Sequence, residues 1–155
     1  MEFVSLNLEF KNMIYKTKSE NELINLGYKI AEKIKGGDIV LLYGDLGAGK
    51  TTMTKGIAKH FGIDEVVSPT FTLMQTYEVD KSASSQASKF VHIDTYRLEN
   101  EEDLIEIGVE DYLGEENTIC VVEWPEKIEG LLKDKKIIKI TIEHSDNGRM
   151  VSMEG

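Results

Sequence analysis

Hydrophobic residues recur with helical spacing in two segments of the first half of the chain. The first pattern begins after Ser19, where Glu22 completes a capping box, and it stops at Gly36. The second pattern covers residues 50–61 and ends at Gly62. Each segment is therefore predicted as an amphipathic helix that buries one face.

Short apolar runs predict the strands. The runs 38–43 and 118–122 are almost wholly apolar, which is typical of strands covered on both faces of a sheet. Residues 71–79 and 89–93 are predicted as a hairpin around the polar, serine-rich tip at 80–88.

The remaining segments complete the order of elements. A strand with a weak pattern is expected over 9–15, and an acidic helix over 101–113. Apolar and polar residues alternate over 136–143, and the turn at Asn147-Gly148 leads into a last strand. The chain has no internal repeat and no linker. It is therefore predicted as one domain, residues 1–155, in which helices pack around a mixed sheet to form an α/β sandwich.

Charge narrows the range of partners. The net charge of −10 disfavours direct binding of nucleic acid, whose backbone is held largely by Lys and Arg. No apolar run is long enough to cross a bilayer, and Met1-Glu2-Phe3 does not resemble the start of a secretion signal. The single cysteine, Cys120, lies in an apolar run and is predicted to be a buried thiol. A cytoplasmic protein without a membrane partner is expected.

The segment that joins the strand at 38–43 to the helix at 50–61 has the pattern G-x-x-x-x-G-K-T. Its glycines allow the backbone to curl so that successive N–H groups face a phosphate, and the helix start adds partial positive charge. Lys50 is expected to reach the outer phosphates, and the Thr51 hydroxyl to ligate Mg²⁺. The predicted nucleotide-binding residues here are Asp45, Leu46, Gly47, Ala48, Gly49, Lys50, Thr51 and Thr52.

The base is expected to be adenine. Guanine-specific proteins with this loop usually carry an Asn-Lys-x-Asp run, and the chain contains none. ATP with Mg²⁺ is therefore the predicted ligand.

Two acidic residues follow predicted buried strands. Asp94 comes after the strand at 89–93, and Glu123 comes after the strand at 118–122. Such positions lie beside the ligand crevice of an open sheet. Glu123 is the better candidate for the shell of the metal, and Asp94 is a candidate to hold a metal-bound water or act as a base. A plain turn-capping role stays open for each.

Other residues allow two interpretations. Trp124, which follows Glu123, is either a core or edge aromatic or part of a flap that responds to nucleotide. His92 is either a hydrogen-bonded core residue or a group that orients the site. Ser68 and Thr70 offer hydroxyls in a loop that could respond to the γ-phosphate.

Arg97 also has two possible uses. It could neutralise phosphate charge, but a surface ion pair with Glu101 or Glu102 is the simpler expectation.

Four motifs occur in a specific order: the loop at 44–52, Ser-Pro-Thr-Phe at 68–71, His-Ile-Asp-Thr-Tyr-Arg at 92–97 and Glu-Trp-Pro-Glu at 123–126. In this combination the chain resembles the bacterial TsaE family, the ATPase component of the tRNA threonylcarbamoyladenosine pathway. The resemblance runs from the capped helix at Ser19 to the turn at Asn147-Gly148-Arg149.

The resemblance implies a P-loop NTPase fold, a three-layer αβα sandwich with a mixed, mainly parallel sheet. It implies that Lys50 binds phosphates, that Thr51 and Glu123 hold Mg²⁺, and that Asp94 is needed for hydrolysis. Ser68 and Thr70 would lie in one switch, with Glu123 and Trp124 in the other. The implied partner is the TsaD–TsaB heterodimer, which would be the only contact with tRNA.

Weak hydrolysis in isolation is expected, because Arg97 and Arg149 are the only arginines available to stabilise transition-state charge. A small-molecule kinase on the same loop is the main alternative, although such enzymes usually close an arginine-bearing lid. A nucleotide-sensing module without useful turnover is the second alternative.

Overall fold

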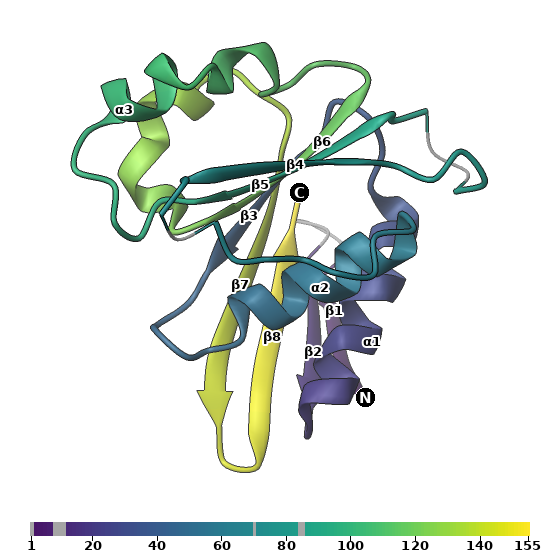
Figure 1. Ribbon diagram of the computed structural model, residues 1–155. Helices are drawn as coiled ribbons and strands as arrows, with labels where there is room; N and C mark the ends of the chain where they lie inside the picture. Colours follow the sequence, from purple (N-terminus) through teal and green to yellow (C-terminus); the bar gives the residue numbers. More distant parts are fainter. Residues whose placement is uncertain (1, 8–11, 70, 84–85) are drawn as a thin grey trace.

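A computed structural model describes residues 2–7, 12–69, 71–83 and 86–155 of the chain, and for residues 2–7 only the backbone is described. Eight strands form one sheet in the order β1-β2-β8-β7-β3-β6-β5-β4 (Figure 1). Their bounds are β1 Glu2–Asn7, β2 Asn12–Thr17, β3 Ile39–Tyr43, β4 Met74–Glu78, β5 Lys89–Asp94, β6 Thr118–Glu123, β7 Ile137–Ser145 and β8 Gly148–Glu154.

The centre of this sheet is parallel and its flanks are antiparallel. Strand β3 pairs in parallel with β6 and β7, and β6 pairs in parallel with β5. The pairings β1–β2, β2–β8, β7–β8 and β4–β5 are antiparallel. The mixed sheet is thus confirmed, and its parallel part comprises the four adjacent strands β7, β3, β6 and β5.

Helices cover both faces of the sheet. Helices α1 (Glu20–Ile30) and α2 (Lys50–His60) lie on one face, and α3 (Glu101–Glu106) lies on the other (Figure 1). Short 3₁₀ segments extend these layers: η1 Ala31–Lys33, η2 Val109–Asp111 and η3 Pro125–Leu132. Two separate apolar clusters, one on each face, fill the space between helices and sheet. The predicted three-layer αβα sandwich is confirmed.

The first two predicted helices form as the sequence indicates. The Glu22 N–H donates to the Ser19 hydroxyl, while the Glu22 carboxylate accepts from the Lys18 N–H, so the capping box closes one residue earlier than the standard pattern. Helix α1 ends at Ile30 and continues as η1 to Lys33, before Gly36. None of the helices among the described residues is both long and apolar enough to span a membrane.

The predicted helix at 101–113 was wrong in its length. Helix α3 ends at Glu106, and Gly108 has a left-handed backbone with φ of 87°. A left-handed residue interrupts the helical hydrogen bonds, so the chain restarts as the short segment η2. Residues 101–113 therefore cap the sheet as two short pieces.

The strand predictions were correct in kind and shifted at their ends. The weak strand expected at 9–15 is β2, which begins at Asn12, and residues 8–11 lie outside the described part. Strand β1 was not predicted. The expected hairpin at 71–93 forms as β4 and β5, although Ser84 and Ser85 in its tip lie outside the description. Cys120 is buried in β6, as predicted, and burial raises the pKa of its thiol to about 12.

Candidate functional site

The glycine-rich loop leaves the carboxyl end of β3 and enters α2. Gly47 and Gly49 adopt left-handed backbone, with φ of 79° and 117°, which side chains rarely tolerate. The Ala48 N–H donates to the Asp45 carbonyl at 3.0 Å and closes the turn. Helix α2 begins at Lys50, so its positive end faces the space enclosed by the loop. The loop thus joins β3 to α2 through left-handed glycines, as its sequence indicates.

Lys50 is folded back over its own loop. Its Nζ donates to the Gly44 carbonyl at 2.5 Å and the Asp45 carbonyl at 2.9 Å, and lies 4.0 Å from the centre of the Trp124 ring. Burial lowers the pKa of Lys50, and the nearby carboxylates, led by Glu123, partly offset this effect. A buried cation held only by carbonyls and a ring is well placed to gain from an incoming anion.

Glu123 connects α2 to the centre of the sheet. It lies in β6, and its two carboxylate oxygens have different partners. Oε1 accepts from the Thr51 hydroxyl at 2.9 Å, and Oε2 lies 2.5 Å from Nε2 of His92. His92 and Glu123 are both buried. His92 is therefore buried and hydrogen-bonded, and the same bond fixes the Glu123 carboxylate beside the loop, so the two interpretations of His92 are compatible.

Asp94 stands next to Glu123, because β5 and β6 are parallel and pair these two residues. Its Oδ1 accepts from the Tyr96 N–H at 3.0 Å. Burial raises the pKa of Asp94 despite this hydrogen bond, and the charge of Glu123 acts in the same direction. The site therefore holds two neighbouring carboxylates on the face of the sheet that α2 covers.

Trp124 belongs to the site and not to either apolar cluster. It has φ of 61°, and the Thr95 hydroxyl donates to its carbonyl at 2.5 Å. The Tyr96 ring packs against the indole with 5.0 Å between centroids. Trp124 thus contacts both Lys50 and Tyr96, and it is half-buried at the end of β6, as an edge aromatic would be.

A cavity of about 420 Å³ lies beside the loop. Ser68 is part of its lining, whereas Thr70 lies outside the described residues. Arg97 also lines the cavity, and its guanidinium carbon lies 4.7 Å from the centre of the exposed Phe71 ring. No ion pair joins Arg97 to Glu101 or Glu102, all three of which are described, so that prediction was wrong. The lining comprises Leu46, Gly47, Gly49, Lys50, Thr51, Thr52, Ser68, Asp94, Tyr96, Arg97, Glu123 and Trp124.

The donors around this cavity suit Mg²⁺ in the presence of phosphate. The Thr51 hydroxyl and the carboxylates of Glu123 and Asp94 are hard oxygen ligands, which this ion prefers. Across the described part of the chain, no group of three or more His, Cys, Asp and Glu side chains is arranged to hold a metal ion.

A second cavity, of about 410 Å³, lies behind the loop and shares Gly47, Gly49 and Thr52 with the first. Thr17 and Arg149 line it, and Thr17 was not predicted to belong to the site. Thr17 is buried, and its hydroxyl has no hydrogen-bond partner. The turn at Asn147-Gly148 and the helix cap at Ser19 were the only local signals for this wall.

Comparison with known proteins agrees with these motifs. A family model described as "Threonylcarbamoyl adenosine biosynthesis protein TsaE" matches residues 17–151. The tRNA threonylcarbamoyladenosine biosynthesis protein TsaE of Rickettsia conorii is 39% identical over 135 residues, which cover 84% of this chain and 71% of the relative. The protein of the same name from Bacillus subtilis is 33% identical over 143 residues, 92% of this chain and 85% of the relative.

A solved structure is similar as well. The crystal structure of Bacillus subtilis YdiB superposes with a TM-score of 0.72 at 30% identity, and the match covers 92% of this chain and 84% of that one.

Proposed function

Because the chain belongs to the TsaE family of threonylcarbamoyl adenosine biosynthesis proteins, we propose that it binds ATP with Mg²⁺ beside the glycine-rich loop and hydrolyses it slowly. One observation carries this proposal. Lys50, Thr51, Asp94 and Glu123 come from three separate segments and converge on a single cavity. Their types and positions are those that a magnesium–triphosphate complex requires.

Each residue has a proposed task. The loop amides and Lys50 bind the phosphates, and Thr51 with Glu123 holds Mg²⁺, which neutralises phosphate charge. Asp94 orients the attacking water or accepts its proton. Burial raises its pKa, which makes it a stronger base than an exposed aspartate.

The second cavity is the proposed place of the base. It adjoins the loop on the side away from Asp94 and Glu123, which is the side left for the nucleoside when the outer phosphate faces those carboxylates. The unpaired Thr17 hydroxyl provides a polar group there that a base can satisfy. Adenine is the proposed base.

Trp124 gives a direct test of nucleotide binding, because it is the only tryptophan and lies against Lys50. Addition of ATP with Mg²⁺ is expected to draw Lys50 from the indole and to change the fluorescence in a saturable way. Calorimetry should give the same affinity, with GTP binding more weakly. A protein that binds GTP far more tightly than ATP would contradict the assignment of adenine, and no affinity for any triphosphate would overturn the proposal.

The proposed partner is the TsaD–TsaB heterodimer, with tRNA contacted only through it. Large apolar side chains are exposed near the site: Leu46 at 69%, Val67 at 63% and Phe71 at 84%. Exposed apolar groups of this size favour a protein contact there. The excess of acidic residues disfavours direct binding of tRNA.

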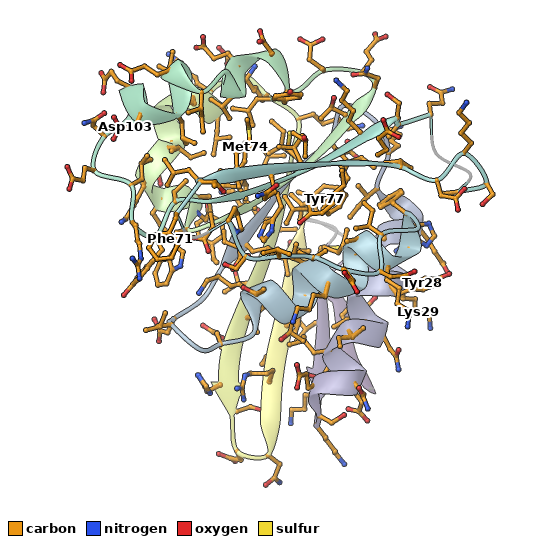
Figure 2. All side chains as sticks on the ribbon, viewed as in Figure 1. Tyr28, Lys29, Phe71, Met74, Tyr77 and Asp103 are labelled. Atoms are coloured by element: carbon orange, nitrogen blue, oxygen red, sulfur yellow. The ribbon has the colours of Figure 1, made fainter. Side chains whose placement is uncertain are left out.

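ATP hydrolysis is expected to rise at least about tenfold on addition of TsaD–TsaB. The reason is that a partner can supply cations that the site lacks. In related phosphoryl-transfer enzymes, a cation supplied by a partner raises turnover strongly. Phosphate release, measured with and without the heterodimer, tests this. Phe71→Ser should reduce the stimulation and leave the basal rate unchanged, since Phe71 projects from the surface (Figure 2). Equal turnover with and without the heterodimer would contradict the proposed partner.

A further inference from the structure

Arg149 forms hydrogen bonds through its guanidinium with backbone carbonyls on the outer side of the glycine-rich loop. It lies at the start of β8, just after the turn between β7 and β8. Its Nε donates to the Ala48 carbonyl at 2.7 Å, and a terminal nitrogen lies 3.3 Å from the Gly47 carbonyl. The other terminal nitrogen donates to the Gly148 carbonyl at 3.0 Å, which holds the guanidinium against its own strand.

These contacts fix the orientation of a peptide group in the loop. In a planar trans peptide the C=O and the following N–H point in opposite directions. The Ala48 carbonyl faces Arg149, so the Gly49 N–H faces away from it. Gly49 also lines the cavity that holds Lys50 and Thr51. The hydrogen bond to the Ala48 carbonyl therefore orients the Gly49 N–H toward the side on which a phosphate would bind.

We propose that Arg149 is a positioning residue that holds the loop in its anion-binding conformation before any nucleotide arrives. This inference rests on the proposed binding of ATP. A loop with two left-handed glycines has many alternative conformations when free, and its ordering costs affinity. Arg149 reduces that cost by keeping the loop ordered in the free protein.

The strand that carries Arg149 is itself firmly placed. Strand β8 is hydrogen-bonded between β2 and β7, and Arg149 pairs with Thr17 on one side and His144 on the other. A Cβ on Gly148 would lie 1.9 Å from the Thr17 carbonyl, so the turn passes close to β2. The guanidinium thus holds the loop at a fixed position relative to the sheet.

Arg149 also lines the second cavity, so direct contact with the base is a competing role. Inorganic tripolyphosphate separates the two roles because it has no base. If Arg149 acts through the loop, Arg149→Met weakens tripolyphosphate and ATP by a similar factor. If it acts through the base, Arg149→Met weakens ATP alone.

Calorimetry with tripolyphosphate and with ATP, both in Mg²⁺ buffer, tests this on the full chain. Arg149→Met is expected to weaken both about tenfold, the usual scale for loss of hydrogen bonds from a charged donor. Lys139→Met removes the same charge from an exposed position on β7 and should leave both affinities unchanged. Arg149→Lys should restore less than half of the lost binding free energy, because an ammonium does not match the two-carbonyl geometry. Full recovery in Arg149→Lys, or loss for ATP alone, would overturn the positioning role.

Hydrogen exchange of the Gly49 amide in nucleotide-free protein gives an independent readout. It should be faster in Arg149→Met than in the wild type and unchanged in Lys139→Met, and equal rates in all three would overturn the proposal. This measurement needs no ligand. If the wild type bound neither ATP nor tripolyphosphate, the proposed function would fail while the exchange data still decided whether Arg149 orders the loop.

Discussion

Lys50→Ala is expected to lower the affinity for ATP by about 100-fold or more, the largest effect of any single substitution in this chain. Charged hydrogen bonds contribute about 1.5–3 kcal/mol each, and an ammonium that meets two phosphate groups makes at least two of them. In the free protein Lys50 instead satisfies the carbonyls of Gly44 and Asp45. Calorimetric titration of ATP with Mg²⁺ measures the loss.

The matched control is Lys55→Ala, which removes the same charge from an exposed position on the same helix. It should bind ATP as the wild type does. The two variants should also unfold at similar temperatures, because removal of the buried Lys50 ammonium eliminates a desolvation cost as well as its hydrogen bonds. An affinity in Lys50→Ala within threefold of the wild type would contradict the role of this side chain.

Asp94→Asn is expected to keep ATP binding within a few-fold and to lower hydrolysis by about 10²–10⁴-fold, the usual contribution of a positioned base. Asparagine preserves the shape and the acceptor for the Tyr96 N–H but cannot take a proton. Single-turnover phosphate release, with ATP affinity measured in parallel, separates the two effects. Asp64→Asn, at an exposed position, serves as the control. Normal turnover in Asp94→Asn would contradict the proposed role of Asp94 in orienting the attacking water or accepting its proton.

The pKa of Asp94 adds a pH signature. Burial raises this pKa in the folded protein, so the folded state binds the proton more tightly than the unfolded chain. The contribution of Asp94 to the free energy of unfolding is fully present below the pKa that Asp94 has in the unfolded chain. This contribution is lost as the pH rises through the pKa that Asp94 has in the folded protein. Asp94→Asn should therefore raise the melting temperature at pH 7, and the gain should shrink in acid. Wild-type hydrolysis should fall as acid protonates Asp94.

The loop was predictable because its signals are local. The glycine spacing, the apolar run before it and the helix after it lie within 38–61, and no distant residue is needed to identify them. Asp94 and Glu123 were also found, because each follows a buried strand and adjacent parallel strands bring such residues together.

The contacts that sequence reasoning missed join distant segments of the chain. Arg149 reaches Ala48 across 101 positions, and Thr17 enters the second cavity because β2 pairs with β8. The bond between His92 and Glu123 depends on the register of β5 and β6, which alternation alone does not give. The break at Gly108 was missed because the apolar spacing continues through it and only the left-handed backbone reveals it.

The hydrogen bonds between Arg149 and the loop also have a consequence for folding during protein synthesis. The glycine-rich loop leaves the ribosome long before β8, and until then no guanidinium meets the Ala48 carbonyl. Strands β2 and β7 likewise have no hydrogen-bonded neighbour between them until β8 is added. A nascent chain that does not yet contain β8 would therefore lack the contact that orders the loop, and we expect it to bind ATP more weakly than the folded chain does.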